Sequence, residues 1–194
     1  LFFLNNLLKI NELIVFISPD FFGNPVSNNY LLNKSYPETA LYIGVIPIIF
    51  ALYAFFLKRK TLVKFYIVTG IIVLLMITVN PLSIYFYSFS LPFISSSSPT
   101  NGIFIISFAL SILAGFGFDK WLNEKSNKLL LISISLLLIT VGGFLIYQIM
   151  HVSFNSKSIL LPMIVLGISI VMFILSIYIN KKQVFFVLLI LITI

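Results

Sequence analysis

The chain has 194 residues, of which 60% are hydrophobic and only 9% charged, and its mean hydropathy is +1.16. This composition argues against a water-soluble domain, because one core could not hide so much apolar surface. The net charge of +7 does not indicate nucleic-acid binding, since the basic residues lie in short clusters between apolar runs. There is no cysteine, which excludes disulfides and cysteine-based sites within this stretch.

The first predicted element is an amphipathic helix from Asn5 to Ile17, a segment that mixes apolar side chains with Asn, Lys and Glu. That mixture suits a helix lying in the membrane interface better than one crossing the membrane. With the polar loop that follows, it forms a predicted outer-face segment, residues 1–38.

Five apolar runs are then long enough to cross a membrane, namely residues 39–57, 65–79, 102–118, 129–150 and 158–179. A sixth run, 183–194, stops short of a full crossing, and the chain opens on Leu1 without a signal peptide. We therefore expect truncation at both ends. The predicted fold class is all-α, a polytopic transmembrane helix bundle forming one domain, with Pro47 and Pro162 starting or kinking helices.

The basic residues give this topology a direction. Nine of the twelve fall on one side, and Lys9, Lys34 and Lys157 fall on the other. Since loops rich in Lys and Arg remain in the cytoplasm, we expect a multi-pass protein of the bacterial plasma membrane with three outer segments, residues 1–38, 80–101 and 151–157. The functional surface is expected on these segments.

The most polar stretch is the first outer loop, from Ser18 to Glu38. The carboxylates of Asp20 and Glu38 could hold a divalent cation against a diphosphate, or one could take a proton from an acceptor hydroxyl, while Lys34 offsets phosphate charge. The alternative is structural: Asp20 caps a turn after Pro19, and Glu38 favours the start of a helix.

Two other features have structural interpretations. His151, the only histidine, has no second ligand close in sequence and is expected to be a solvated loop residue. Ser107, Ser111 and Gly115 recur at four-residue spacing, with Ala114 and Gly117 nearby, which is typical of a helix-packing face.

Three blocks in this order resemble the bacterial YfhO family: Ile17-Ser-Pro-Asp-Phe-Phe-Gly23, Glu38-Thr-Ala-Leu-Tyr-Ile-Gly-Val-Ile-Pro47 and Leu113-Ala-Gly-Phe-Gly-Phe-Asp119. That family looks like part of the GT-C superfamily, which transfers a sugar from a polyprenyl-phosphate donor to an acceptor on the outer face. The resemblance implies a cell-envelope acceptor such as a teichoic acid, and an outer cavity lined by the first two blocks. The candidate catalytic residue is then Glu38, and the candidate substrate-binding residues are Asp20, Tyr30, Lys34 and Tyr42.

The sequence departs from this family in two ways. Where related sequences carry an arginine before the third apolar helix, this chain reads Ser95-Ser-Ser-Ser-Pro-Thr-Asn101. The main acidic residue of such enzymes is also expected upstream of Leu1. Two alternatives therefore stay open: a transporter or flippase for a lipid-linked intermediate, and a non-catalytic membrane scaffold.

Overall fold

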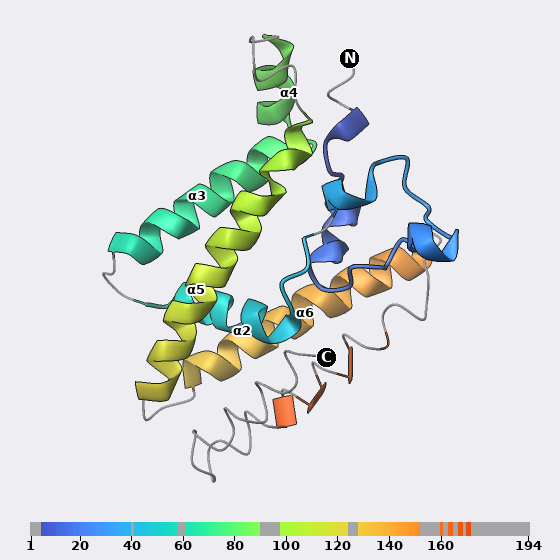
Figure 1. Ribbon diagram of the computed structural model, residues 1–194. Helices are drawn as coiled ribbons and strands as arrows, with labels where there is room; N and C mark the ends of the chain where they lie inside the picture. Colours follow the sequence, from blue (N-terminus) through green and yellow to red (C-terminus); the bar gives the residue numbers. More distant parts are fainter. Residues whose placement is uncertain are drawn as a thin grey trace.

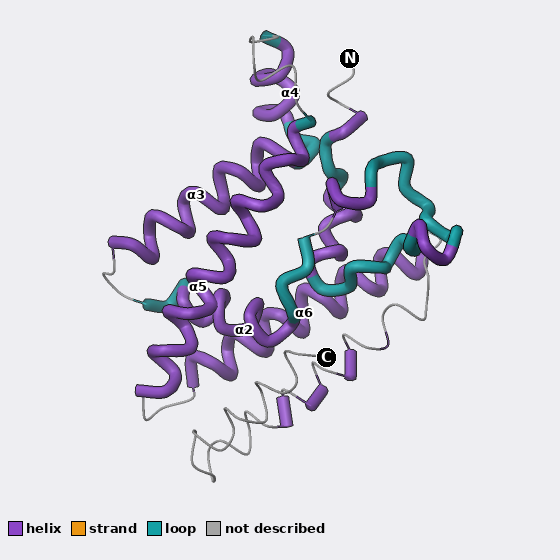
Figure 2. The backbone as a smooth tube through the Cα atoms, viewed as in Figure 1, coloured by secondary structure: helices purple, strands orange, loops and turns teal. Residues whose placement is uncertain are grey.

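The computed structural model describes residues 5–39, 41–57, 61–89, 98–123 and 128–151, with residues 160, 163, 164, 167, 168, 170 and 171. This part of the chain is helical and contains no strand (Figure 2). The all-helical class predicted from sequence is confirmed. The elements in chain order are η1 (Ile10–Phe16), η2 (Pro25–Ser27), η3 (Tyr36–Thr39), α2 (Val45–Ala54), α3 (Thr61–Ile77), α4 (Pro81–Ser88), η4 (Pro99–Gly102), α5 (Ile103–Asn123) and α6 (Lys128–His151).

Helix α5 is the centre of the fold, and it packs against both α2 and α3. Figure 1 shows α3 and α5 running side by side, α6 crossing next to α2, and α4 projecting from the end where α3 stops. Helix α2 follows Gly44, and Pro47 lies in its first turn, where a missing backbone N–H costs nothing. Pro47 therefore marks a helix start, as predicted.

The packing of α5 on α2 depends on one glycine. A Cβ atom on Gly117 would lie 2.0 Å from the carbonyl oxygen of Phe50, so the two backbones touch at this point. Ala114 is buried at the same interface, whereas Gly115 faces open space and Ser111 is exposed. The predicted packing face is thus displaced around the helix, because the turn that meets α2 carries Ala114 and Gly117.

Within the described residues, one helix is long and apolar enough to cross a membrane: η4 and α5 together, Pro99–Asn123, with a mean hydropathy of 1.9. Val45–Ala54, Thr61–Ile77 and Ile132–Gly143 are shorter apolar helices. The five crossings expected from the sequence are therefore not confirmed. Most of the predicted run 158–179, and all of 183–194, lie outside the described residues.

The N-terminal segment differs from the predicted interfacial helix. Among its described residues, Asn5 and Asn6 are helical and a separate 3-10 helix, η1, covers Ile10–Phe16, so no continuous helix runs from Asn5 to Ile17. Before η1, the N–H of Leu8 donates to the carbonyl of Ile77 and the carbonyl of Leu8 accepts from the N–H of Val79, each at 2.8 Å. Leu7, Leu8, Ile14 and Val15 are buried in the protein, so these apolar side chains face its interior rather than a bilayer.

Candidate functional site

The polar loop between η1 and α2 is anchored by two phenylalanines. Phe21 and Phe22 are buried in an apolar cluster with Leu8, Ile14 and Ile77. Gly23, which follows them, has φ = +86°, and a Cβ there would lie 2.0 Å from the carbonyl oxygen of Asn29. Only glycine suits this turn. The first block of the family resemblance therefore has a structural role at three of its positions.

Asp20 holds two parts of this loop together. Its Oδ1 accepts a hydrogen bond from the Tyr36 hydroxyl at 2.6 Å and another from Nδ2 of Asn24 at 3.2 Å. The hydrogen bond to Asp20, together with burial, raises the pKa of Tyr36 to about 12. These contacts favour the structural interpretation of Asp20 over a role in metal binding.

Lys34 forms an ion pair with Glu12, and each side chain is only 6% exposed. The Lys34 ammonium also donates to the carbonyl of Leu7 at 2.7 Å, while Glu12 accepts from the backbone N–H of Lys9 at 3.0 Å. A phosphate could reach Lys34 only by opening this pair. Glu12 is a residue that sequence reasoning missed, because its partner is 22 positions away and no local pattern joins them.

Tyr30, Tyr36 and Glu38 lie close together in the same part of the loop as Asp20. The rings of Tyr30 and Tyr36 meet edge to face, with centroids 5.6 Å apart, and the Tyr30 hydroxyl is hydrogen bonded to that of Thr39 at 3.3 Å. Burial raises the pKa of Tyr30, and the negative charges of Glu12 and Glu38 raise it further. We call Asp20, Tyr30, Tyr36, Glu38 and Thr39 the loop cluster.

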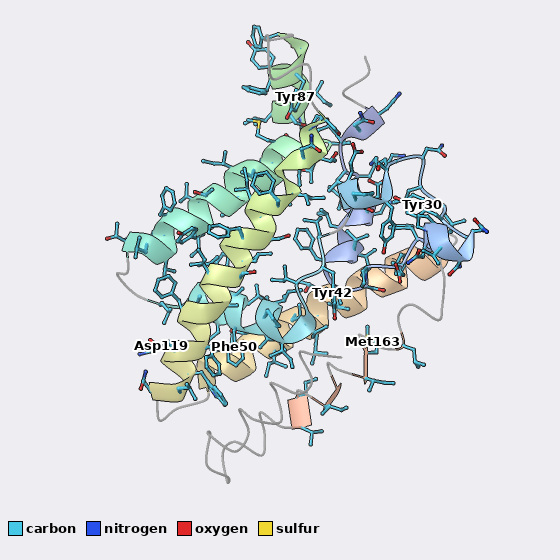
Figure 3. The ribbon with its side chains drawn as sticks, viewed as in Figure 1. Tyr30, Tyr42, Phe50, Tyr87, Asp119 and Met163 are labelled. Carbon is cyan, nitrogen blue, oxygen red and sulfur yellow. The ribbon has the colours of Figure 1, made fainter. Side chains whose placement is uncertain are left out.

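Glu38 is the carboxylate of this cluster that remains available. It lies in η3, is half-buried, and makes no side-chain hydrogen bond or ion pair with the part of the chain that the structure describes. Tyr42, by contrast, packs against the core around α2, and Figure 3 shows it apart from Tyr30. The structure thus gathers Asp20, Tyr30 and Glu38, places Tyr42 against the core, and pairs Lys34 with Glu12.

An apolar cavity of about 240 Å³ lies between the end of η1 and helices α2, α3 and α5. Apart from the Tyr66 phenol, it is lined by aliphatic side chains, phenylalanine and glycine: Phe16, Ile17, Ile48, Phe55, Tyr66, Ile67, Gly70, Ile71, Leu74, Ile106, Ala109, Leu110 and Leu113. Ile17 leads directly into Ser18 and the polar loop. Such a cavity suits a hydrocarbon chain rather than a polar ligand.

Metal binding has little support in this part of the molecule. Among the described residues, no three His, Asp or Glu side chains gather where they could hold a metal ion. His151 is the last residue of α6 rather than part of a loop. The described residues therefore do not supply a three-ligand site for the divalent cation considered from the sequence.

The three sequence blocks converge in space. Ile17, Tyr42, Leu113 and Phe118 all contact the apolar core built around α2. Burial in this shared core accounts for much of their apolar character, and at Gly117 the third block approaches the backbone of α2 closely.

No protein-family model, curated protein or solved structure matches the chain.

Proposed function

We propose that this chain belongs to a membrane glycosyltransferase that moves a sugar from a polyprenyl-phosphate donor to a cell-envelope polymer, such as a teichoic acid. The observations that carry the proposal are an apolar cavity bordered by Phe16 and Ile17, and an available carboxylate, Glu38, in the polar loop that follows Ile17. A lipid tail would occupy the cavity, and its phosphate and sugar would lie near the loop cluster.

The proposal places most of the chain in a bilayer. Large apolar side chains point outward along α3 and α5, including Val68, Ile72, Phe104 and Phe108. Each would cost about 25 cal/mol per Å² in water, and lipid removes that cost. Helix α2 has only ten residues, but most of them are buried and it packs against α5 and α6, so the helix itself is largely shielded from lipid.

Glu38 is the proposed general base. Its carboxylate would take the proton of the acceptor hydroxyl while that oxygen attacks the anomeric carbon, and polyprenyl phosphate would leave with the electrons of the broken bond. Tyr30, in the same cluster, offers an aromatic face and a hydroxyl to the sugar. Lys34 contributes indirectly, because its pair with Glu12 fixes the loop that carries this cluster.

The test is Glu38→Gln in the full-length protein, with the glycosylation of envelope polymers measured by mass spectrometry. Loss of the proton acceptor should lower the transfer rate by about 10²–10⁴-fold. Asp119→Asn is the matched control, because it makes the same chemical change at an exposed carboxylate at the end of α5. Unchanged glycosylation in Glu38→Gln would reject the catalytic role.

A vesicle assay separates transfer from transport. The full-length protein is reconstituted with a lipid-linked sugar in one leaflet, and both sugar transfer and sugar exposure in the other leaflet are followed. Transfer to acceptor supports the proposal. Movement of the lipid-linked sugar without transfer would replace it with the flippase alternative.

A further inference from the structure

A long uncharged hairpin runs through the middle of the chain. Residues 65–118 contain no Asp, Glu, Lys, Arg or His. They form most of α3, all of α4 and most of α5, and the pairs Gly70/Ala109 and Gly102/Ile77 show that α3 and α5 run antiparallel. Lys64, Asp119 and Lys120 therefore lie toward one end of the hairpin, and α4 projects from the other end (Figure 1).

The asparagine and serine side chains of α4 and its N-cap are hydrogen bonded within the protein. The Oδ1 of Asn80 accepts from the N–H groups of Leu82 and Ser83, each at 3.0 Å, which caps the helix. The Ser83 hydroxyl donates to the carbonyl of Thr78 at 2.6 Å, and the Ser88 hydroxyl donates to the carbonyl of Tyr85 at 2.6 Å. This internal pairing is what a helix end needs where water is scarce.

The apolar side chains of α4 point outward around most of its circumference. Leu82 is 51% exposed, Ile84 42% and Tyr85 68%, and Phe89 at the C-cap is 57% exposed. At about 100° per residue these positions leave only one side of the helix, that of the buried Ser83, turned to the protein. A helix with this surface is poorly suited to an aqueous loop.

We infer that α4 is an interfacial anchor that lies in the headgroup and upper acyl region of the outer leaflet. Figure 3 shows Tyr87 on the projecting helix, which also carries Tyr85. Each tyrosine combines an aromatic ring with a hydroxyl and so suits the headgroup boundary. Leu82, Ile84 and Phe89 extend into the acyl chains. The anchor fixes the depth of the hairpin and rests on the membrane insertion proposed above.

A lipid surface explains α4 better than a protein partner does. Exposed apolar side chains also occur elsewhere on the hairpin, at Leu75 and Val79 toward the end of α3 and at Phe104 of α5. No charged residue of the hairpin lies near α4 to specify a partner. An uncharged apolar surface with tyrosines at its end matches the bilayer boundary. Binding to a bilayer depends on hydrophobicity and on the position of polar groups along the membrane normal, and it does not require a surface of complementary shape.

Site-directed spin labelling tests the anchor. Because this chain contains no cysteine, Tyr85→Cys introduces the one thiol of this stretch, and any cysteine elsewhere in the full-length protein is replaced. The labelled protein is reconstituted in vesicles of phosphatidylglycerol and phosphatidylethanolamine. Collision of the label with oxygen, which concentrates in lipid, is compared with collision with a water-soluble nickel chelate.

Two further single-cysteine variants calibrate the depth scale. Phe108→Cys lies at a 59% exposed position in α5 and should collide mainly with oxygen, while Val26→Cys, 91% exposed in the polar loop, should collide mainly with nickel. The label at position 85 should favour oxygen but report a shallower depth than the label at position 108.

A second set of variants carries the label at Ile84→Cys. Adding Tyr85→Ser and Phe89→Ser to this variant should increase collisions of the label with nickel several-fold, whereas adding Tyr85→Trp should leave them unchanged.

The outcomes separate the anchor from the function proposal. A water-like label at position 85 beside a lipid-like label at position 108 overturns the anchor and leaves membrane insertion intact. An immobile label at position 85 that collides with neither reagent shows a protein contact and also overturns the anchor. A water-like label at position 108 overturns membrane insertion itself, and the anchor with it.

Discussion

Lys34 and Glu12 are each only 6% exposed, so bulk water solvates neither charge. Their attraction, the Lys34 bond to the Leu7 carbonyl and the Lys9 N–H bond to Glu12 offset the cost of removing both charges from water. The pair joins the N-terminal segment to the polar loop. Its main consequence is that neither partner can be removed alone without leaving a buried charge.

Lys34→Met should therefore lower the free energy of unfolding by about 3–5 kcal/mol, because Glu12 stays buried without its partner. Denaturant unfolding in detergent micelles, followed by circular dichroism, measures the change. Lys9→Met is the matched control at an exposed lysine and should change stability by less than about 0.5 kcal/mol. Equal effects in the two variants would show that the pair contributes nothing specific.

Adding Glu12→Gln to Lys34→Met should restore much of the lost stability. The amide oxygen of glutamine can still accept from the Lys9 N–H, and no unpaired charge remains. The double-mutant cycle is measured under the same unfolding conditions. A double variant as unstable as Lys34→Met alone would mean that the lost packing of Lys34, rather than the stranded charge, explains the loss.

The Tyr36 hydroxyl donates to Asp20, and this bond raises the pKa of Tyr36 to about 12. Since the folded-state pKa lies above the ordinary value of about 10, the folded protein holds this proton more tightly than the unfolded chain. The stabilisation is complete below about pH 10 and is lost as the pH rises toward 12.

Asp20→Asn should shift the Tyr36 titration down toward about 10, because the amide no longer carries the charge that opposes tyrosinate. The difference in tyrosinate absorbance between each protein and its Tyr36→Phe variant isolates this one tyrosine. A Tyr36 titration that is the same with Asp and with Asn at position 20 would contradict the hydrogen bond as its cause.

At this scale the sequence predicted contacts within the polar loop but not contacts between that loop and distant segments. Asp20, Tyr30 and Glu38 do gather in the loop cluster, as their proximity along one loop suggested. Lys34 was expected to face a phosphate, but it pairs with Glu12 because the chain folds the N-terminal segment back against the loop. That contact depends on tertiary structure and has no signal in local sequence.

Among the elements, the contact between α2 and α5 is set by Gly117, whose Cβ position lies 2.0 Å from the Phe50 carbonyl oxygen. Gly117→Ala should force the helices apart and destabilise the protein by about 1–3 kcal/mol, seen as a lower thermal unfolding midpoint in detergent. Phe50 and Trp121, whose ring centroids are 5.6 Å apart, pack close by, so their aromatic circular dichroism should also weaken.

Gly115→Ala is the control on the same helix. No atom lies within 4 Å of its Cβ position, and alanine favours a helix over glycine by about 1 kcal/mol. This variant should be as stable as the parent or more so. If Gly115→Ala and Gly117→Ala destabilised equally, the loss would come from α5 itself and not from its contact with α2.

The hydropathy pattern located the helices well but not their ends or their partners. The apolar runs predicted α3, α5 and α6 to within a few residues, because hydrophobic periodicity is strong over such lengths. Helix α4 lies within the outer segment 80–101, where no helix was predicted, although Asn80 before Pro81 is a signal for a helix start. The four-residue spacing of Ser107, Ser111 and Gly115 predicted the wrong packing face, since spacing alone does not say which side of the helix meets a neighbour.

For the whole molecule, the distribution of lysine and arginine predicts an orientation that can be measured directly. Val26→Cys, in the exposed polar loop, should react with a membrane-impermeant maleimide added to intact cells. Asn123→Cys, at the exposed end of α5 next to Lys120 and Lys125, should react only after the membrane is permeabilised. The reverse pattern would invert the proposed topology and remove the loop cluster from the outer face.

The all-helical class followed from composition, whereas the arrangement of the helices did not. The three sequence blocks, which contain Ile17, Tyr42 and Leu113, meet around one apolar core. Phe21, Phe22, Gly23 and Gly117 have packing or backbone reasons for their identity, so a match at these positions bears on the fold more than on chemistry. Glu38 is the position in the blocks whose chemistry is left to test.

The two hydrogen bonds of Leu8 also bear on how the protein is made. Leu8 leaves the ribosome long before Ile77 and Val79, so its backbone partners do not exist while the first segment is being synthesised. An unpaired backbone is costly inside a bilayer and harmless in water. Under the membrane insertion proposed above, the segment around Leu8 is expected to stay at the aqueous boundary and to dock only after α3 has been inserted, so it should become protected from proteolysis later than α3.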